Sequence, residues 1–227
     1  MSKNPFETGI LTVITQNIFF FINASLFFMI SVLPAALWFL FLERSLLDLL
    51  FIFLAGPAIS AICRFMIAYI ETDFSKDDYP GLNDYLVYYR RNFKESLTYW
   101  IPYCILMFIL LTNLDAYQWG SYLMGLVMSG VYLAIIGVVT LIVGYFFLIS
   151  AKFKFKLNDL FRLSIYHIFV ELKATLGILA VLILTLVGIF FVNEFLILVF
   201  SGPLIYILVR YGYAVVENVG KHFVSQE

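Results

Sequence analysis

Residues 56–65 read Gly56-Pro57-Ala58-Ile59-Ser60-Ala61-Ile62-Cys63-Arg64-Phe65, and a later stretch repeats the pattern as Gly202-Pro203-Leu204-Ile205-Tyr206-Ile207-Leu208-Val209-Arg210-Tyr211. In each copy an Arg follows the Pro by seven positions, and a Glu (Glu71, Glu217) follows it by fourteen. Both copies lie in apolar sequence, where charged side chains are costly to bury. The repeat indicates a duplicated helical architecture more than a particular activity.

The composition predicts an integral membrane protein. Hydrophobic residues make up 63% of the 227 residues and charged residues only 13%, too few to cover the surface of a water-soluble domain of this size. We therefore expect a single all-α membrane domain over residues 1–227. The net charge of −1 gives no support to nucleic acid as a partner.

Six segments are long and apolar enough to cross a bilayer, which needs about 20 helical residues. The predicted spans are 18–41, 46–70, 97–114, 122–149, 174–192 and 195–216. Pro34 is expected to bend the first span or end it early. Two longer polar segments, 71–96 and 150–173, separate the second span from the third and the fourth from the fifth.

The distribution of positive charge predicts the orientation of these spans. Every Lys and Arg except Arg44 falls on one side: in the N-terminus, in the two polar segments, or at the span ends and tail facing them. Positive residues mark the cytoplasmic side of a membrane protein. We therefore expect six spans, arranged as three helical hairpins, with both termini in the cytoplasm. The two Gly-Pro copies then cross in the same direction, as in a parallel repeat.

Each polar segment is expected to contain a cytoplasmic amphipathic helix that leads into the next hairpin. Apolar residues recur at helical spacing in both, beside basic residues that are candidates for contact with lipid or with a cytoplasmic partner: Arg90, Arg91, Lys94, Arg162 and Lys173. One interpretation is a membrane-surface anchor attracted to anionic lipid. The other is a docking helix for a partner protein.

Arg64 and Arg210, with Glu71 and Glu217, form a candidate polar site. Within each copy the Arg and Glu share a helix face about 10 Å apart, which we expect to be too far for a direct pair. The favoured interpretation is that each Arg extends to the lipid headgroups. The alternative is that both face a polar cavity and hold an anionic ligand or an interhelical carboxylate.

Gly56, Pro57, Gly202 and Pro203 are predicted helix breaks, because Pro removes a backbone donor and clashes with the preceding turn. A kink or a helix restart should follow, and each Gly should allow close packing. Cys63 and Cys104 are expected to be buried structural thiols. The sequence contains no motif for a catalytic nucleophile, a phosphate-binding loop or a metal site, so we predict neither an enzyme nor a cofactor.

Three short motifs resemble the YesL family of bacterial membrane proteins, which is domain of unknown function 624. They are Gly56-Pro57-Ala58-Ile59-Ser60-Ala61, the run from Tyr85 to Phe93 that ends Arg90-Arg91-Asn92-Phe93-Lys94, and Lys173-Ala174-Thr175-Leu176. The resemblance extends over about residues 15–217. It implies a multi-pass protein of the bacterial plasma membrane, but no catalytic or ligand-binding residues.

Members of this family often lie beside carbohydrate importers of the ABC class and glycan-degrading enzymes. The resemblance therefore implies a non-enzymatic accessory protein that supports sugar uptake by contacting the permease or ATPase subunits of an importer, with membrane lipid around it. An alternative is a small transporter or a handler of lipid-linked glycans in cell-envelope metabolism, such as that of teichoic-acid-like polymers. An intramembrane enzyme of cell-wall polymer synthesis is the least supported hypothesis.

Overall fold

The computed structural model describes residues 10–41, 53–72, 79–117, 122–191 and 198–223, and the regular structure in these ranges is helical throughout. The all-α prediction is confirmed. The described helices are α1 (Ile10–Phe41), α3 (Ala55–Glu71), α4 (Leu82–Tyr117), α5 (Tyr122–Lys152), α6 (Leu157–Val170), α7 (Leu172–Phe191) and α9 (Ser201–His222).

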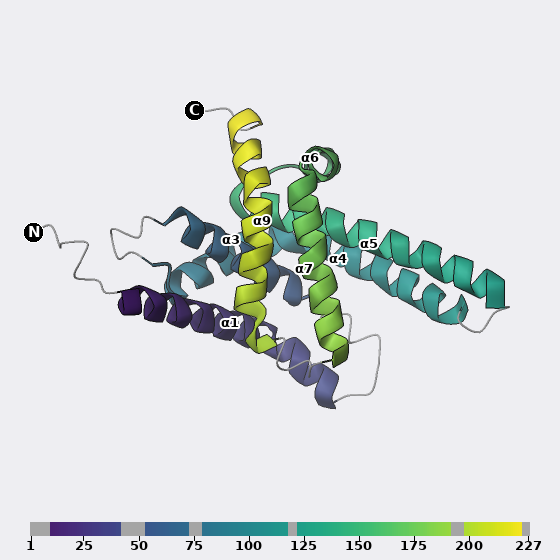
Figure 1. Cartoon of the computed structure of the whole chain (residues 1–227), viewed down its shortest axis with the longest axis horizontal. Coiled ribbons are helices and arrows are strands. Elements are labelled where there is room, and N and C mark those ends of the chain that lie inside the picture. Colours follow the sequence, from purple (N-terminus) through teal and green to yellow (C-terminus); the bar gives the residue numbers. More distant parts are fainter. Residues whose placement is uncertain (1–9, 42–52, 73–78, 118–121, 192–197, 224–227) are drawn as a thin grey trace, which may run out of the picture.

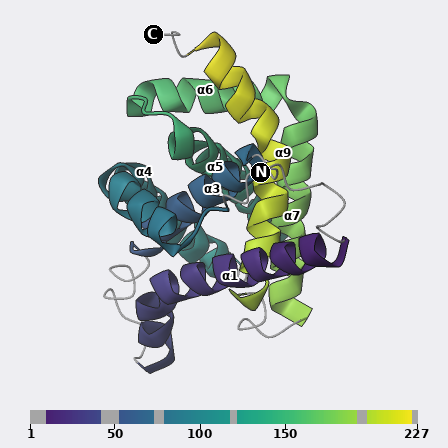
Figure 2. The same cartoon turned by 90° about the vertical axis from the view of Figure 1, so that its left-hand side faces the viewer.

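α3 is the centre of the fold. It contacts α1, α4, α5 and α9, and Ile62, Phe65, Met66 and Ile67 on it are completely buried. α7 and α9 run side by side, while α4 and α5 extend together away from the other helices and across the direction of α7 and α9 (Figure 1). α1 crosses below the lower end of α9, and the last turns of α1 bend away from the axis of its first turns (Figure 2). A bend there agrees with the prediction for Pro34, although α1 continues to Phe41.

Three helical segments are long and apolar enough to cross a membrane: Ile14–Leu33, Leu82–Tyr117 and Leu123–Lys152. α6 and α7 pass the same test together, with a bend of 97° between them. α3 has 17 residues, or about 25 Å of helix, which is short of a bilayer core of about 30 Å. α9 is long enough but carries Arg210, Glu217 and Lys221. The structure therefore supports three or four candidate spans, and the six-span arrangement is not confirmed.

The Gly-Pro pairs mark helix starts. α3 begins at Ala55 and α9 at Ser201, each one residue before its Gly. These starts agree with the predicted helix restart, because Pro is well accommodated in a first helical turn that needs no intrahelical donor. The parts of the predicted spans 46–70 and 195–216 at 46–52 and 195–197 lie outside the described residues.

No helix end occurs at the predicted boundary at residue 96. The amphipathic helix of segment 71–96 and the third span form one continuous helix, α4, which runs through Pro102. The buried side chains of its first half, including Tyr85, Asn92 and Ser96, share one face, so the polar segment packs on the bundle while its backbone continues into the apolar part. The second amphipathic helix, α6, is separate as predicted.

Candidate functional site

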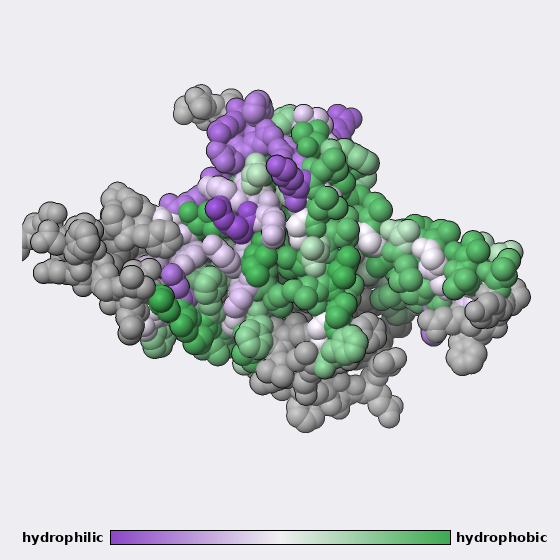
Figure 3. All heavy atoms as spheres, viewed as in Figure 1, coloured by the Kyte–Doolittle hydropathy of each residue, from purple (hydrophilic) through white to green (hydrophobic). Residues whose placement is uncertain are grey.

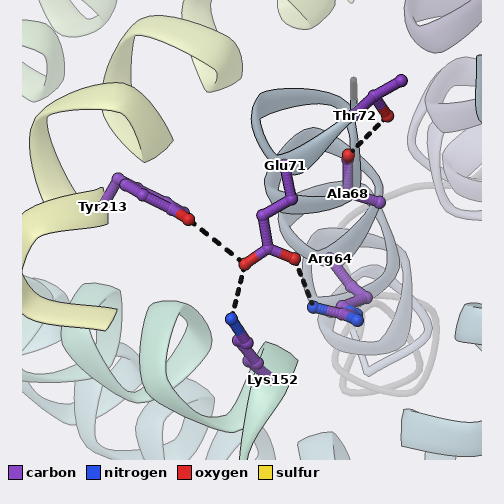
Figure 4. Close-up of polar contacts among 6 residues, drawn as sticks. All are labelled: Arg64, Ala68, Glu71, Thr72, Lys152 and Tyr213. Carbon is purple, nitrogen blue, oxygen red and sulfur yellow. Dashed lines mark hydrogen bonds and ion pairs between the residues drawn. The ribbon is translucent and has the colours of Figure 1, made fainter. Parts of the chain in front are cut away.

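Figure 4 shows Glu71 at the centre of a polar cluster where α3, α5 and α9 meet. Lys152, in the last turn of α5, donates a 2.5 Å hydrogen bond from Nζ to Glu71 Oε1. The Tyr213 hydroxyl of α9 donates to the same oxygen at 3.3 Å. Arg64 Nη1 lies 3.8 Å from Glu71 Oε2. One carboxylate therefore joins three helices and offsets two positive charges.

The expectation that Arg64 and Glu71 are too far apart for a direct pair is wrong. The two side chains extend toward one another along α3 and close the two helical turns between their backbones. The Arg64 guanidinium also lies over the Tyr88 ring of α4, with 5.5 Å from Cζ to the ring centroid, in a cation–π contact. The Arg64 side chain is 24% exposed, so it lies inside the bundle more than it extends to solvent or headgroups.

The second copy of the repeat is arranged differently. Glu217 pairs with Lys221 at 2.6 Å, one turn further along α9, and this contact lowers the pKa of Glu217 below its usual range. Arg210 is exposed and forms no ion pair with a described residue. The charges of both nevertheless act on Tyr213, as that of Glu71 does. Three of the four predicted residues, Glu71, Arg210 and Glu217, thus lie around Tyr213, whereas Arg64 lies over Tyr88.

The two glycines of the repeat do allow the close packing that was predicted. A Cβ at Gly56 would lie 2.5 Å from the Trp100 ring of α4. A Cβ at Gly202 would lie 2.7 Å from the Phe21 carbonyl oxygen of α1. In both copies the first turn of the helix packs closely against a neighbouring helix, and the Cβ of any other residue would clash there.

The five candidate contact residues are all exposed. Arg90, Arg91 and Lys94 share the face of α4 opposite its buried side chains. Arg162 lies on α6 and Lys173 in the first turn of α7. None of the five forms an ion pair or hydrogen bond with a described residue.

Polar residues gather over the C-terminal half of α9, whereas α7 and the α4–α5 hairpin are covered by apolar side chains (Figure 3). Glu71 and Lys152, at the ends of α3 and α5, meet α9 on this side, and α6, from one of the two segments expected in the cytoplasm, lies near it.

The bend between α6 and α7 is held by residues that the pattern did not single out for this role. Thr175 Oγ1 donates to the Ile168 and Glu171 carbonyls at 2.9 and 3.1 Å, and the buried Tyr145 hydroxyl lies 2.7 Å from it. Asn218 of α9 donates to the Glu171 carboxylate at 3.0 Å. Tertiary contacts of this kind leave no local signal in a sequence.

His167 lies in the last turn of α6, four positions before Glu171. The His167 ring is completely buried, and neither of its nitrogens has a hydrogen-bond partner among the described residues. Burial lowers its pKa, and the nearby charge of Glu171 opposes this shift. His167 and Glu171 therefore interact through their charges and not through a hydrogen bond. Cys63 and Cys104 are buried free thiols, as predicted.

A group of three or more His, Cys, Asp or Glu residues placed to hold a metal ion does not occur in the described ranges. The cluster around Glu71 contains one carboxylate that is already engaged by Arg64, Lys152 and Tyr213. Its geometry is that of an interhelical clamp.

Residues 13–114 match the model of a family described as "Protein of unknown function, DUF624". The matched part comprises most of α1, all of α3 and most of α4, and within it the match agrees with the resemblance drawn from the motifs. No curated protein and no solved structure matches the chain.

Proposed function

We propose that this chain is a non-enzymatic accessory protein of the bacterial plasma membrane that supports carbohydrate uptake by associating with an ABC-type sugar importer. The family resemblance supports the setting, because relatives often lie beside such importers. The observation that carries the proposal is the exposed basic face of α4 formed by Arg90, Arg91 and Lys94.

This face has the properties of a docking surface. Its three cations lie opposite the buried face of α4, on a helix that the protein core holds rigidly through Tyr85 and Tyr99. Tyr85 donates a 2.9 Å hydrogen bond to Ser31 of α1, which fixes the first turn of α4 on the bundle. A rigid helix with unpaired cations is suited to an acidic surface on a permease or ATPase subunit.

The proposed topology places this face in the cytoplasm. It comprises six crossings in three hairpins with both termini inside, and it rests on the location of every Lys and Arg except Arg44. The gathering of polar residues at one end of the molecule supports it (Figure 3). Cysteine-accessibility labelling of single-Cys variants at residues 91 and 119 tests it, since only the latter should react from outside the cell.

Copurification in mild detergent tests the proposed association. The tagged protein should recover importer subunits, and the variant R90E/R91E/K94E should lose them because it reverses the charge of the face. The variant R90K/R91K/K94R keeps the charge and should retain them. Recovery of the protein alone, together with unchanged sugar uptake in a deletion strain, would refute the proposal.

The alternative function, transport or handling of an anionic lipid-linked glycan by paired arginines, requires both guanidinium groups to face one cavity. Arg64 is engaged by Glu71 and Tyr88, and Arg210 is exposed. No described contact favours this alternative.

A further inference from the structure

The position of α6 relative to a membrane follows from the helices on either side of it. α5 carries no charge from residue 123 to residue 151 and then reaches Lys152. α7 carries no charge from residue 174 to residue 191, directly after Lys173. The charge-free stretches of both helices therefore end close to α6, and the 97° bend turns α6 across the direction of α7. A helix beside the charged ends of two apolar helices has the setting of one that lies at the boundary between hydrocarbon and water.

A groove of about 410 Å³ lies between α6 and the adjacent parts of α4 and α5. Its apolar wall is formed by Pro102 of α4, Phe146 of α5, and Leu157 and Phe161 of α6. The Tyr99 hydroxyl in this wall is already hydrogen bonded to Ser150 Oγ at 2.9 Å, so it adds no free polar group.

The polar rim of this groove is formed by Asn158 and Arg162. Both are exposed, and Arg162 forms no ion pair with any residue in the described ranges. Arg162 also borders a second groove on the other side of α6, where Asp159 supplies a negative charge. Among the described residues, no acidic side chain lines the first groove, so Arg162 gives its rim a positive charge.

Other charges nearby keep this positive character. Lys156 precedes α6 and is exposed. Glu95, one turn before Tyr99 on α4, is subject to the charge of Lys154. The groove therefore combines an apolar wall with a cationic rim.

We propose that this α6 groove binds one anionic phospholipid from the surrounding membrane. The Arg162 guanidinium and the Asn158 amide donate hydrogen bonds to the lipid phosphate, and the upper part of one acyl chain lies along Phe146 and Phe161. Phosphate is suited to the fork of donors in a guanidinium group. This site goes beyond the proposed accessory function and does not depend on it.

Native mass spectrometry of the full chain tests the site. The protein, in mild detergent, is incubated with equal amounts of phosphatidylglycerol and phosphatidylcholine that have the same acyl chains. One phosphatidylglycerol should remain bound in preference to phosphatidylcholine. Arg162→Gln should reduce this preference by about tenfold, the scale of a hydrogen bond between charged groups. Asn158→Trp should lower binding of both lipids, because the indole fills the groove.

Lys221→Gln is the control, since it removes an exposed positive charge on α9 that does not line the groove. It should leave lipid binding unchanged, and an equal loss in the Arg162 and Lys221 variants would overturn the proposal in favour of diffuse electrostatic attraction. Equal retention of the two lipids by the wild-type protein would also overturn it. Water-soluble glycerol phosphate at the same concentration should not displace the lipid; displacement would mean that the rim binds free phosphate and that the apolar wall has no role.

Discussion

Gly202 and Ser25 meet across 177 positions of sequence: the Gly202 amide donates a 2.9 Å hydrogen bond to Ser25 Oγ, and both residues are buried. The contact satisfies one of the amide groups that a helix start leaves unpaired, here at the first turn of α9. A side chain on α1 thus caps α9, and the absence of a Cβ at residue 202 makes the approach possible.

Gly202→Ala should destabilise the protein by about 1–3 kcal/mol, because the added methyl group would lie 2.7 Å from the Phe21 carbonyl oxygen and 2.6 Å from Ser25 Oγ. Thermal unfolding in detergent measures the effect. The control is Gly130→Ala on α5, where a Cβ would meet nothing within 4 Å. It should be neutral or slightly stabilising. A similar loss in both variants would show that helix flexibility, not close packing, explains the glycine.

Glu71→Gln should cost about 1 kcal/mol of stability, because the neutral amide leaves Lys152 and Arg64 without their common counter-charge. The difference from wild type should shrink at high salt, since part of it is electrostatic. Glu217→Gln removes a single exposed pair with Lys221 and should change the melting temperature little. Equal effects from the two substitutions would contradict the central position assigned to Glu71.

Thr175→Val should destabilise the α6–α7 bend by about 1–3 kcal/mol, because it retains the shape of the side chain but removes its bonds to two carbonyls and leaves the buried Tyr145 hydroxyl unpaired. Hydrogen exchange in α6 should rise. Thr185→Val is the matched control, since Thr185 Oγ1 bonds only to the carbonyl one turn back on its own helix. Unchanged exchange in α6 of the Thr175 variant would show that the bend is held by other contacts.

The stability of the protein should fall when the pH drops below neutrality, and His167 should be one cause. Burial lowers the pKa of His167 from its ordinary value of 6.5, so the unfolded chain binds this proton more readily than the folded protein. The contribution of His167 to the free energy of unfolding is therefore fully present above about pH 6.5, and it is lost as the pH falls toward the pKa of His167 in the folded protein. Melting temperatures between about pH 5 and pH 8 measure this slope, and His167→Gln should flatten it. An identical slope in the variant would assign the effect to other groups.

The sequence alone predicts the helical class, a separate helix at α6 and close packing at the glycines of the two Gly-Pro pairs. These features depend on local composition and periodicity. α6, for example, shows helical spacing of apolar residues between two helices that each carry a single charge, at the end next to α6. The start of α9 at its Gly-Pro pair follows from the same local chemistry, since Pro fits a first helical turn.

The clamp at Glu71 could not be predicted in the same way. Glu71 was expected to share a helix face with Arg64, but its partners Lys152 and Tyr213 are 81 and 142 positions away. Lys152 looks in the sequence only like the first charge after an apolar helix. The direction of the α4–α5 hairpin is equally inaccessible, because it is determined by packing against α3 and not by periodicity.

The enclosure of α3 has a consequence for the biosynthesis of the protein. α3 leaves the ribosome before α4, α5 and α9, yet these later helices bury most of its surface and supply Lys152 and Tyr213 to Glu71. At 17 residues and with Arg64 inside it, α3 is poorly suited to remain in lipid by itself. The nascent α3 therefore needs shelter, at the insertion machinery or at the membrane surface, until the last helix of the chain has been made.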